Sequence, residues 1–228
     1  MEPRAKTQLQ TQGIPVATLV LLAANIAYLV FLYVTGAIGS SSGMVERGAI
    51  YVPYVVTGHQ YFRLLTAMFM HFSPQHIFGN MLLLVMLGRY LEEEFGPLRY
   101  VLIYLVVGVV ANIASVYYYN LRSPYTITAG ASGAVLGLVG LMVWILIVNR
   151  GRYRGISLGR IVIMIAFTIY NGVQGGGINN VAHIAGLACG FVAGLIFYRP
   201  NRPDDTDDLT RYYQDRNSGP NGRRNIIP

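Results

Sequence analysis

The residues that could carry out chemistry are polar residues that interrupt long apolar stretches. Ser132 lies in the stretch ITAGASGAVLGLVGL, between Gly130 and Gly133. A serine hydroxyl becomes a nucleophile when a nearby base removes its proton, and histidine is the most common base. A hydroxyl between two glycines can also simply let two helices approach closely. The chain has four histidines that are candidates for such a base: His59, His71, His76 and His183.

The acidic residues are distributed in a way that limits the chemistry. Glu92, Glu93 and Glu94 follow an apolar stretch, and every aspartate lies after position 200. This excludes a two-aspartate protease and disfavours a transporter that uses buried carboxylates. The sequence has no H-E-x-x-H motif, and His71 and His76 lack the i, i+4 spacing of paired zinc ligands, so we expect no metal and no cofactor. If Ser132 is a nucleophile, its base is a histidine without an acidic third member.

The elements that must position these residues are membrane-spanning helices. The chain has 228 residues, of which 54% are hydrophobic and 12% are charged, against about 25% charged residues in a soluble domain. A span needs about 20 mostly apolar residues. We therefore predict an all-α membrane protein with six transmembrane helices. The predicted spans are residues 14–36, 73–91, 97–119, 132–149, 158–173 and 179–198.

The basic residues predict the orientation of these spans. When the connecting segments are assigned alternately to two sides, 14 of the 17 lysines and arginines fall on one side. An excess of this kind marks the cytoplasmic side, so we expect both termini in the cytoplasm of a multi-pass protein, in a prokaryotic cell membrane. The net charge of +7 therefore reflects topology. No basic motif interleaved with aromatic residues is present, and we expect no nucleic-acid partner.

This topology places four polar residues from three spans at a similar depth. The second, fourth and sixth spans all begin on the outer side, so His76, Asn80, Ser132 and His183 lie near the outer leaflet. His76 and Asn80 are also one helical turn apart. Small residues recur every fourth position in the sixth span and recur in the fourth, which lets these two helices approach closely. The predicted contact brings Ser132 and His183 within hydrogen-bonding reach.

The remaining segments define the predicted domain organisation. We expect a cytoplasmic N-terminal lead at 1–13, a single membrane domain at 14–198 and a disordered cytoplasmic tail at 199–228. The apolar loop at 37–62 is interpreted as a half-buried segment at the membrane interface. The glycine-rich segment 171–180 joins the last two spans and is a candidate flexible cap.

Three motifs on alternate spans resemble those of the rhomboid family of intramembrane serine proteases. GASG at 130–133 is similar to its G-x-S-G motif, AHIAGLACG at 182–190 to its A-H-x-x-G-x-x-x-G motif, and HFSPQHIFGN at 71–80 to its H-x4-H-x3-N signature. FRLLTAMFMH at 62–71 is similar to a Trp-Arg element, with Phe62 in place of the tryptophan. A family aromatic residue four positions after the serine is replaced here by Leu136.

The resemblance implies a six-helix rhomboid bundle and a set of residue roles. Ser132 would be the nucleophile and His183 the general base. His76, Asn80 and the Ser132 backbone N–H would bind the oxyanion, and Glu92 would be structural. Substrates would be single-span or other transmembrane segments, entering from the lipid bilayer beside the fifth span, with small residues near the bond that is cut.

Two other classes of protein remain as alternatives. A non-catalytic binder or chaperone of the same fold would recognise helices without cutting them. A small-solute transporter, whose uptake would tolerate Ser132→Ala, is the second alternative, although the sequence has no convincing internal repeat of the kind common in transporters.

Overall fold

Helices dominate the described part of the chain, and the last of them ends at Phe197. The computed structural model describes residues 14–174 and 179–200. In chain order the elements are α1 (Val16–Val34), α2 (Ser41–Glu46), β1 (Ile50–Tyr51), α3 (Val52–Val56), α4 (Arg63–Thr66), η1 (Ala67–Phe69), α5 (Pro74–Phe95), α6 (Pro97–Arg122), β2 (Ile127–Thr128), α7 (Ser132–Val148), β3 (Arg152–Tyr153), β4 (Ile156–Ser157), α8 (Leu158–Gln174) and α9 (Asn180–Phe197).

Three predictions fall wholly or partly on residues that the structure does not describe. The predicted lead at 1–13 and the predicted tail from residue 201 onward lie outside the described residues. The predicted cap at 171–180 is described only at its edges. Its first four residues belong to α8, which continues to Gln174, and residues 175–178 lie outside the described part.

The long helices coincide with the apolar stretches of the sequence. In the described part of the chain, each predicted span overlaps a helix of at least 17 residues. Three of these helices, α1, α6 and α9, are long and apolar enough to cross a membrane, and α7 is apolar but shorter. The chain is thus mostly helical with three candidate spans, and the count of six spans stays a prediction.

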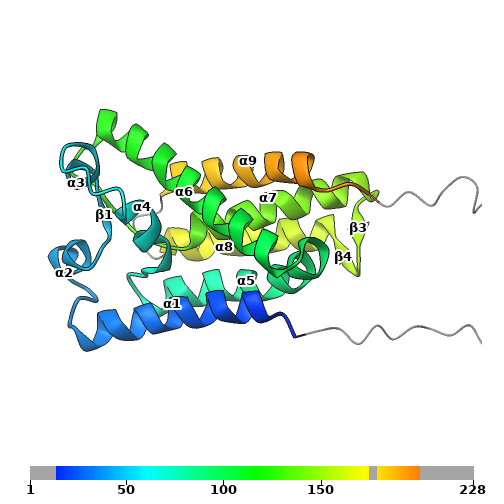
Figure 1. Ribbon diagram of the computed structural model, residues 1–228, viewed down its shortest axis with the longest axis horizontal. Coiled ribbons are helices and arrows are strands. Elements are labelled where there is room, and N and C mark those ends of the chain that lie inside the picture. Colours follow the sequence, from blue (N-terminus) through cyan, green and yellow to red (C-terminus); the bar gives the residue numbers. More distant parts are fainter. Residues whose placement is uncertain (1–13, 175–178, 201–228) are drawn as a thin grey trace, which may run out of the picture. The chain divides into compact units, whose positions relative to one another are not determined.

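The loop predicted at 37–62 is more structured than the sequence indicates. It folds into short helices, and β1 pairs antiparallel with β2, so that Ile50 lies opposite Thr128. The short helices gather at one end of the long helices, and the β3–β4 hairpin lies at the other (Figure 1). The strict all-α prediction therefore misses two small ladders, because strands of two residues carry no periodic signal.

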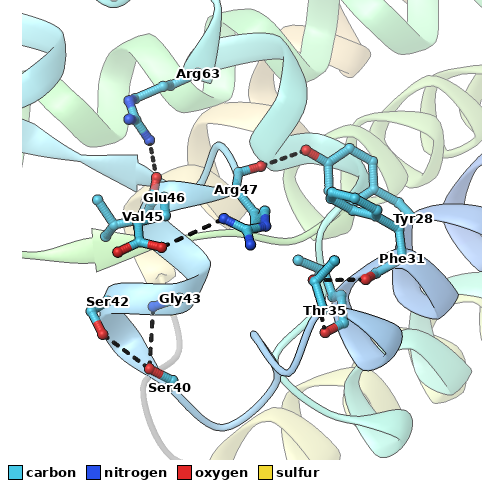
Figure 2. A network of polar contacts seen from close by, with 11 residues as sticks. Tyr28, Phe31, Thr35, Ser40, Ser42, Gly43, Val45, Glu46, Arg47 and Arg63 are labelled. Atoms are coloured by element: carbon cyan, nitrogen blue, oxygen red, sulfur yellow. Dashed lines mark hydrogen bonds and ion pairs between the residues drawn. The ribbon is translucent and has the colours of Figure 1, made fainter.

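A buried arginine holds the segment between α1 and α5 together. Arg63 is 5% exposed, and its Nη1 donates hydrogen bonds to the carbonyl oxygens of Val45 at 2.6 Å and Ala49 at 2.8 Å. The Tyr28 hydroxyl of α1 donates to the carbonyl of Arg47 at 2.6 Å. Figure 2 shows Arg63 and Tyr28 reaching the end of α2, at Val45 and Arg47. These contacts give partners to backbone carbonyls that are buried or partly buried, which such groups need.

Helix α7 lies in the core and packs closely against α9. All its residues from Gly133 to Met142 are buried. A Cβ added at Gly186 would collide with the carbonyl oxygen of Gly133, and one added at Gly190 would collide with that of Gly137. The predicted close contact between these two helices is therefore present, with backbone against backbone at the glycines.

A buried carboxylate connects α5 to the beginning of α1. Glu92 accepts hydrogen bonds from the backbone N–H groups of Ala17 and Thr18 and from the Thr18 hydroxyl, each at 2.8 Å. These first-turn N–H groups have no partner inside the helix, and Pro15 supplies no side-chain cap. Negative charge is also favourable at this end of the helix dipole. Glu92 thus caps α1 from a different helix.

The β3–β4 hairpin is attached to the end of α5. Arg154 Nη1 lies 2.6 Å from a carboxylate oxygen of Glu93, and the Tyr153 hydroxyl donates a hydrogen bond to Glu94. Burial and this hydrogen bond raise the pKa of the Tyr153 phenol, so the hydroxyl stays protonated and remains a donor. The hairpin leads directly into α8, so these contacts fix where α8 begins.

Candidate active site

Ser132 is the first residue of α7, immediately after a tight turn. The turn contains Gly130, which has φ of 143° and donates its N–H to the carbonyl oxygen of Ala67 at 2.9 Å. Glycine is the residue that adopts this conformation readily. The first N–H groups of a helix have no helical partner, so backbone donors lie next to the Ser132 hydroxyl.

His183 meets Ser132 from the first turn of α9. Its Nε2 lies 2.8 Å from Ser132 Oγ. Asn179 caps this helix, because its Oδ1 accepts the Ala182 N–H at 3.0 Å and its carbonyl accepts the His183 N–H at 3.1 Å. The Asn179 amide also donates to Ser115 Oγ in α6 at 2.6 Å. His183 therefore lies in the first turn of a helix whose capping residue is itself hydrogen-bonded to α6.

No carboxylate supports this histidine in the described part of the chain. The glutamates there are Glu46 in α2 and three consecutive residues at the end of α5, and the structure gives each of the four another partner. Among the described residues, no group of three or more His, Cys, Asp or Glu side chains could hold a metal ion. The chemistry available to Ser132 and His183 is therefore that of a hydroxyl and an imidazole.

The start of α5 supplies a second polar cluster. His76 and Asn80 are one turn apart, and Ser73 caps this helix by accepting the His76 N–H at 3.2 Å. Asn80 is 3% exposed, and its Nδ2 lies 3.1 Å from Nε2 of His71. The rings of His71 and His76 meet edge to face, with centroids 5.0 Å apart.

Gly130 connects this cluster to the serine. A Cβ at Gly130 would lie 2.8 Å from His76 Cε1, 3.0 Å from His76 Nε2 and 3.6 Å from Ser132 Oγ. The imidazole of His76 and the hydroxyl of Ser132 therefore border the same small space above the Gly130 backbone. Only a residue without a side chain leaves that space open.

The structure brings the predicted side chains together to different degrees. Ser132 and His183 are in direct contact, and His76 lies against the turn before Ser132. The side chain of Asn80 is bonded to His71, the first histidine of the H-x4-H-x3-N signature, to which the sequence-based prediction gives no role in binding the oxyanion. His71 lies nine residues before Asn80, in the segment before α5, where helical spacing gives no signal.

Two further residues near the site carry weaker sequence signals. Asn179 is the first residue of the predicted span 179–198, and asparagine is favoured at the capping position that it occupies before α9. Its partner Ser115 lies in the middle of an apolar helix, and the sequence does not indicate which neighbour it faces. Leu136, which replaces an aromatic residue of the resembled motif, is 5% exposed and packs in the hydrophobic core.

Comparisons with known proteins point to one family. The family described as "Rhomboid domain" matches residues 58–200. "Rhomboid protease GluP" of Bacillus subtilis is 31% identical over 188 residues, which cover 82% of this chain and 36% of the relative. "RHOMBOID-like protein 1" of Arabidopsis thaliana is 34% identical over 163 residues, which cover 70% and 41%. "Rhomboid protease AarA" of Providencia stuartii is 28% identical over 201 residues, which cover 79% and 71%.

The match includes the whole candidate site and more than half of the chain. The chain spans less than half the length of GluP and of RHOMBOID-like protein 1, at 36% and 41%. All residues from His71 to His183 lie inside the family match. Together with the three candidate spans, this makes the chain an integral membrane protein of the multi-pass type, and it belongs to the rhomboid family.

Proposed function

We propose that this protein is an intramembrane serine endopeptidase that cleaves transmembrane segments with a Ser132–His183 dyad. The observation that carries the proposal is the 2.8 Å contact between Ser132 Oγ and His183 Nε2, from two helices whose glycines pack backbone to backbone. Relatives named rhomboid proteases, GluP and AarA, support the same reaction class.

The dyad moves one proton in each half of the reaction. Ser132 Oγ attacks the carbonyl carbon of the scissile peptide bond while His183 Nε2 takes the hydroxyl proton. The imidazolium then gives this proton to the leaving amine, and the C–N bond breaks to leave an acyl-enzyme. A water molecule, deprotonated by His183, hydrolyses the ester and returns Ser132 to its starting state.

Three groups are proposed to stabilise the oxyanion of the tetrahedral intermediate. The Ser132 N–H lies at the start of α7, where the helix dipole also favours negative charge. The imidazole of His76 borders the same space as Ser132 Oγ, and Asn80 lies one turn further along α5. Each well-placed donor contributes about 3 kcal/mol to such a transition state.

The substrate is proposed to be a transmembrane helix that unwinds locally near the outer leaflet. An intact helix keeps its carbonyl groups in its own hydrogen bonds, so an exposed carbonyl requires local unwinding. In the proposed topology of six spans, with both termini cytoplasmic in a prokaryotic cell membrane, the dyad lies toward the outer side. The fold would then hold the hydrolytic groups in a polar space that water enters from that side.

The decisive test is cleavage of a single-span substrate in proteoliposomes by dyad variants. We expect Ser132→Ala and His183→Ala to lower the cleavage rate by roughly 10⁴-fold or more, to background. Ser42→Ala removes an exposed hydroxyl that bonds only locally to Ser40. His59→Asn removes an exposed imidazole at a φ of 53°, which asparagine tolerates. Both control variants should cleave at the wild-type rate.

Full activity of either dyad variant would contradict the proposal. A wild-type protein that retains single-span proteins without cutting any of them would indicate a helix-binding rhomboid instead. Uptake of a small solute that survives Ser132→Ala would indicate a transporter.

A further inference from the structure

His71 is a fully buried polar side chain whose position the proposed reaction does not yet use. It is 0% exposed and lies between η1 and the start of α5. Its Nε2 lies 3.1 Å from Asn80 Nδ2, and its ring meets that of His76 edge to face. One buried imidazole thus contacts both side chains that are proposed to bind the oxyanion.

The chemistry of the two groups fixes the direction of the hydrogen bond. An amide nitrogen only donates, so Nε2 of His71 is the acceptor and the proton of the neutral imidazole lies on Nδ1. The Asn80 NH₂ group has two N–H donors. One points at His71, which fixes the amide plane and leaves the second donor free for another acceptor.

The segment that contains His71 also supports the serine side of the site. The carbonyl oxygen of Ala67, four residues earlier, accepts the N–H of Gly130 in the turn before Ser132. Residues 67–71 therefore contact the turn that presents the nucleophile and the helix that presents Asn80. A rigid connection of this kind keeps the two halves of an oxyanion site at a constant separation.

We propose that His71 is the positioning residue for Asn80, and that its Nε2 holds the Asn80 amide so that the second N–H donates to the oxyanion. This inference rests on the proposed function, because an oxyanion forms only if the protein is a serine protease. His71 itself contacts neither the substrate nor the reacting atoms. Its effect passes through a donor whose orientation decides how strongly it stabilises the intermediate.

Two substitutions of similar polarity separate this role from simple packing. In His71→Gln the side-chain amide reaches about as far as Nε2 and offers a carbonyl acceptor to Asn80. In His71→Asn the shorter side chain reaches only as far as Nδ1 and loses the contact. We expect kcat to fall by about tenfold or more in His71→Asn, with KM nearly unchanged, and by about threefold or less in His71→Gln.

The same pair in an Asn80→Ala background gives the critical comparison. If His71 acts through Asn80, the Gln and Asn variants cleave at the same rate there, because the group they orient is gone. Rates come from cleavage of a single-span substrate in proteoliposomes, and thermal unfolding checks that each variant is folded. A tenfold difference that persists without Asn80 would overturn the proposal, as would equal rates for the two variants with Asn80 present.

The remaining outcomes also decide the question. Failure of both His71 variants to fold would assign His71 to the fold alone and overturn the positioning role. Wild-type activity in Asn80→Ala would overturn this inference and leave the Ser132–His183 dyad intact. Absence of cleavage by the wild-type protein would contradict the proposed function itself.

Discussion

At the scale of single residues, the site depends on groups whose positions are fixed by the backbone rather than by a charged partner. His183 touches Ser132 at 2.8 Å, and the described part of the chain places no carboxylate behind it. An imidazole without such a partner is oriented by where its helix begins. In the proposed dyad, the cap by Asn179 fixes where the helix of His183 begins, whereas in a triad an aspartate orients the imidazole directly.

Gly130→Ala tests the turn that presents the nucleophile. The added methyl group would lie 2.8 Å from His76 Cε1, at a φ of 143° that alanine rarely adopts. We expect the cleavage rate per folded molecule to fall by about tenfold to a hundredfold, because the imidazole and the turn are both displaced. The rate is measured with the same single-span substrate.

Gly39→Ala is the matched control for this substitution. Gly39 also has a positive φ, of 82°, but a Cβ there would meet no atom within 4 Å. We expect a modest loss of stability from backbone strain and an unchanged cleavage rate. If the two alanine variants cleave equally well, the space above Gly130 has no part in the reaction.

The sequence predicts some of these residues and misses others for a physical reason. Four polar residues interrupt apolar helices: Ser132, His76, Asn80 and His183. Their similar depth along the predicted spans is enough to predict that they lie near one another. The contact of Asn80 with His71 depends on how the chain turns before α5. The H-x4-H-x3-N signature contains both residues, but their spacing alone does not show that the His71 side chain turns back onto Asn80.

At the scale of elements, the approach of α7 and α9 determines whether the dyad can form. The small-residue stripes predict this contact, and the structure has it, with Gly186 against Gly133 and Gly190 against Gly137. In lipid, helices associate through close packing, since burying apolar surface gains little there. The glycines position the dyad indirectly, by letting the two helix backbones meet.

Gly190→Ala is expected to weaken this contact. Its methyl group would collide with the Gly137 carbonyl oxygen, which is backbone and cannot turn away. We expect a loss of about 1–3 kcal/mol in the free energy of unfolding, measured in detergent, together with slower cleavage. Gly159→Ala in α8 is the control, because no atom lies within 4 Å of its added Cβ. There we expect unchanged or slightly higher stability.

Equal unfolding of the two glycine variants would mean that the α7–α9 approach is not a determinant of stability.

The sequence contains no comparable signal for the short elements between α1 and α5. Two-residue strands and helices of four to six residues are held by contacts such as those of Arg63 with distant carbonyl groups. Their formation depends on tertiary partners, which local sequence patterns do not contain.

At the scale of the whole molecule, the distribution of apolar and basic side chains fits a protein surrounded by lipid. Large apolar side chains such as Val34, Val106 and Ile184 are more than half exposed on three different long helices. Contact between so many apolar side chains and water would be unfavourable. The excess of basic residues on one side predicts which end faces the cytoplasm. The proposed orientation would place the proposed dyad toward the outer leaflet.

The most direct test of this account is to map where a single-span substrate is cut. Purified protein and substrate are combined in proteoliposomes, and the masses of both products are measured. We predict one cut inside the apolar segment, in its outer half, with no products from Ser132→Ala. A cut in the cytoplasmic half, or the same products from Ser132→Ala, would contradict the central claim that Ser132 cleaves transmembrane segments near the outer leaflet.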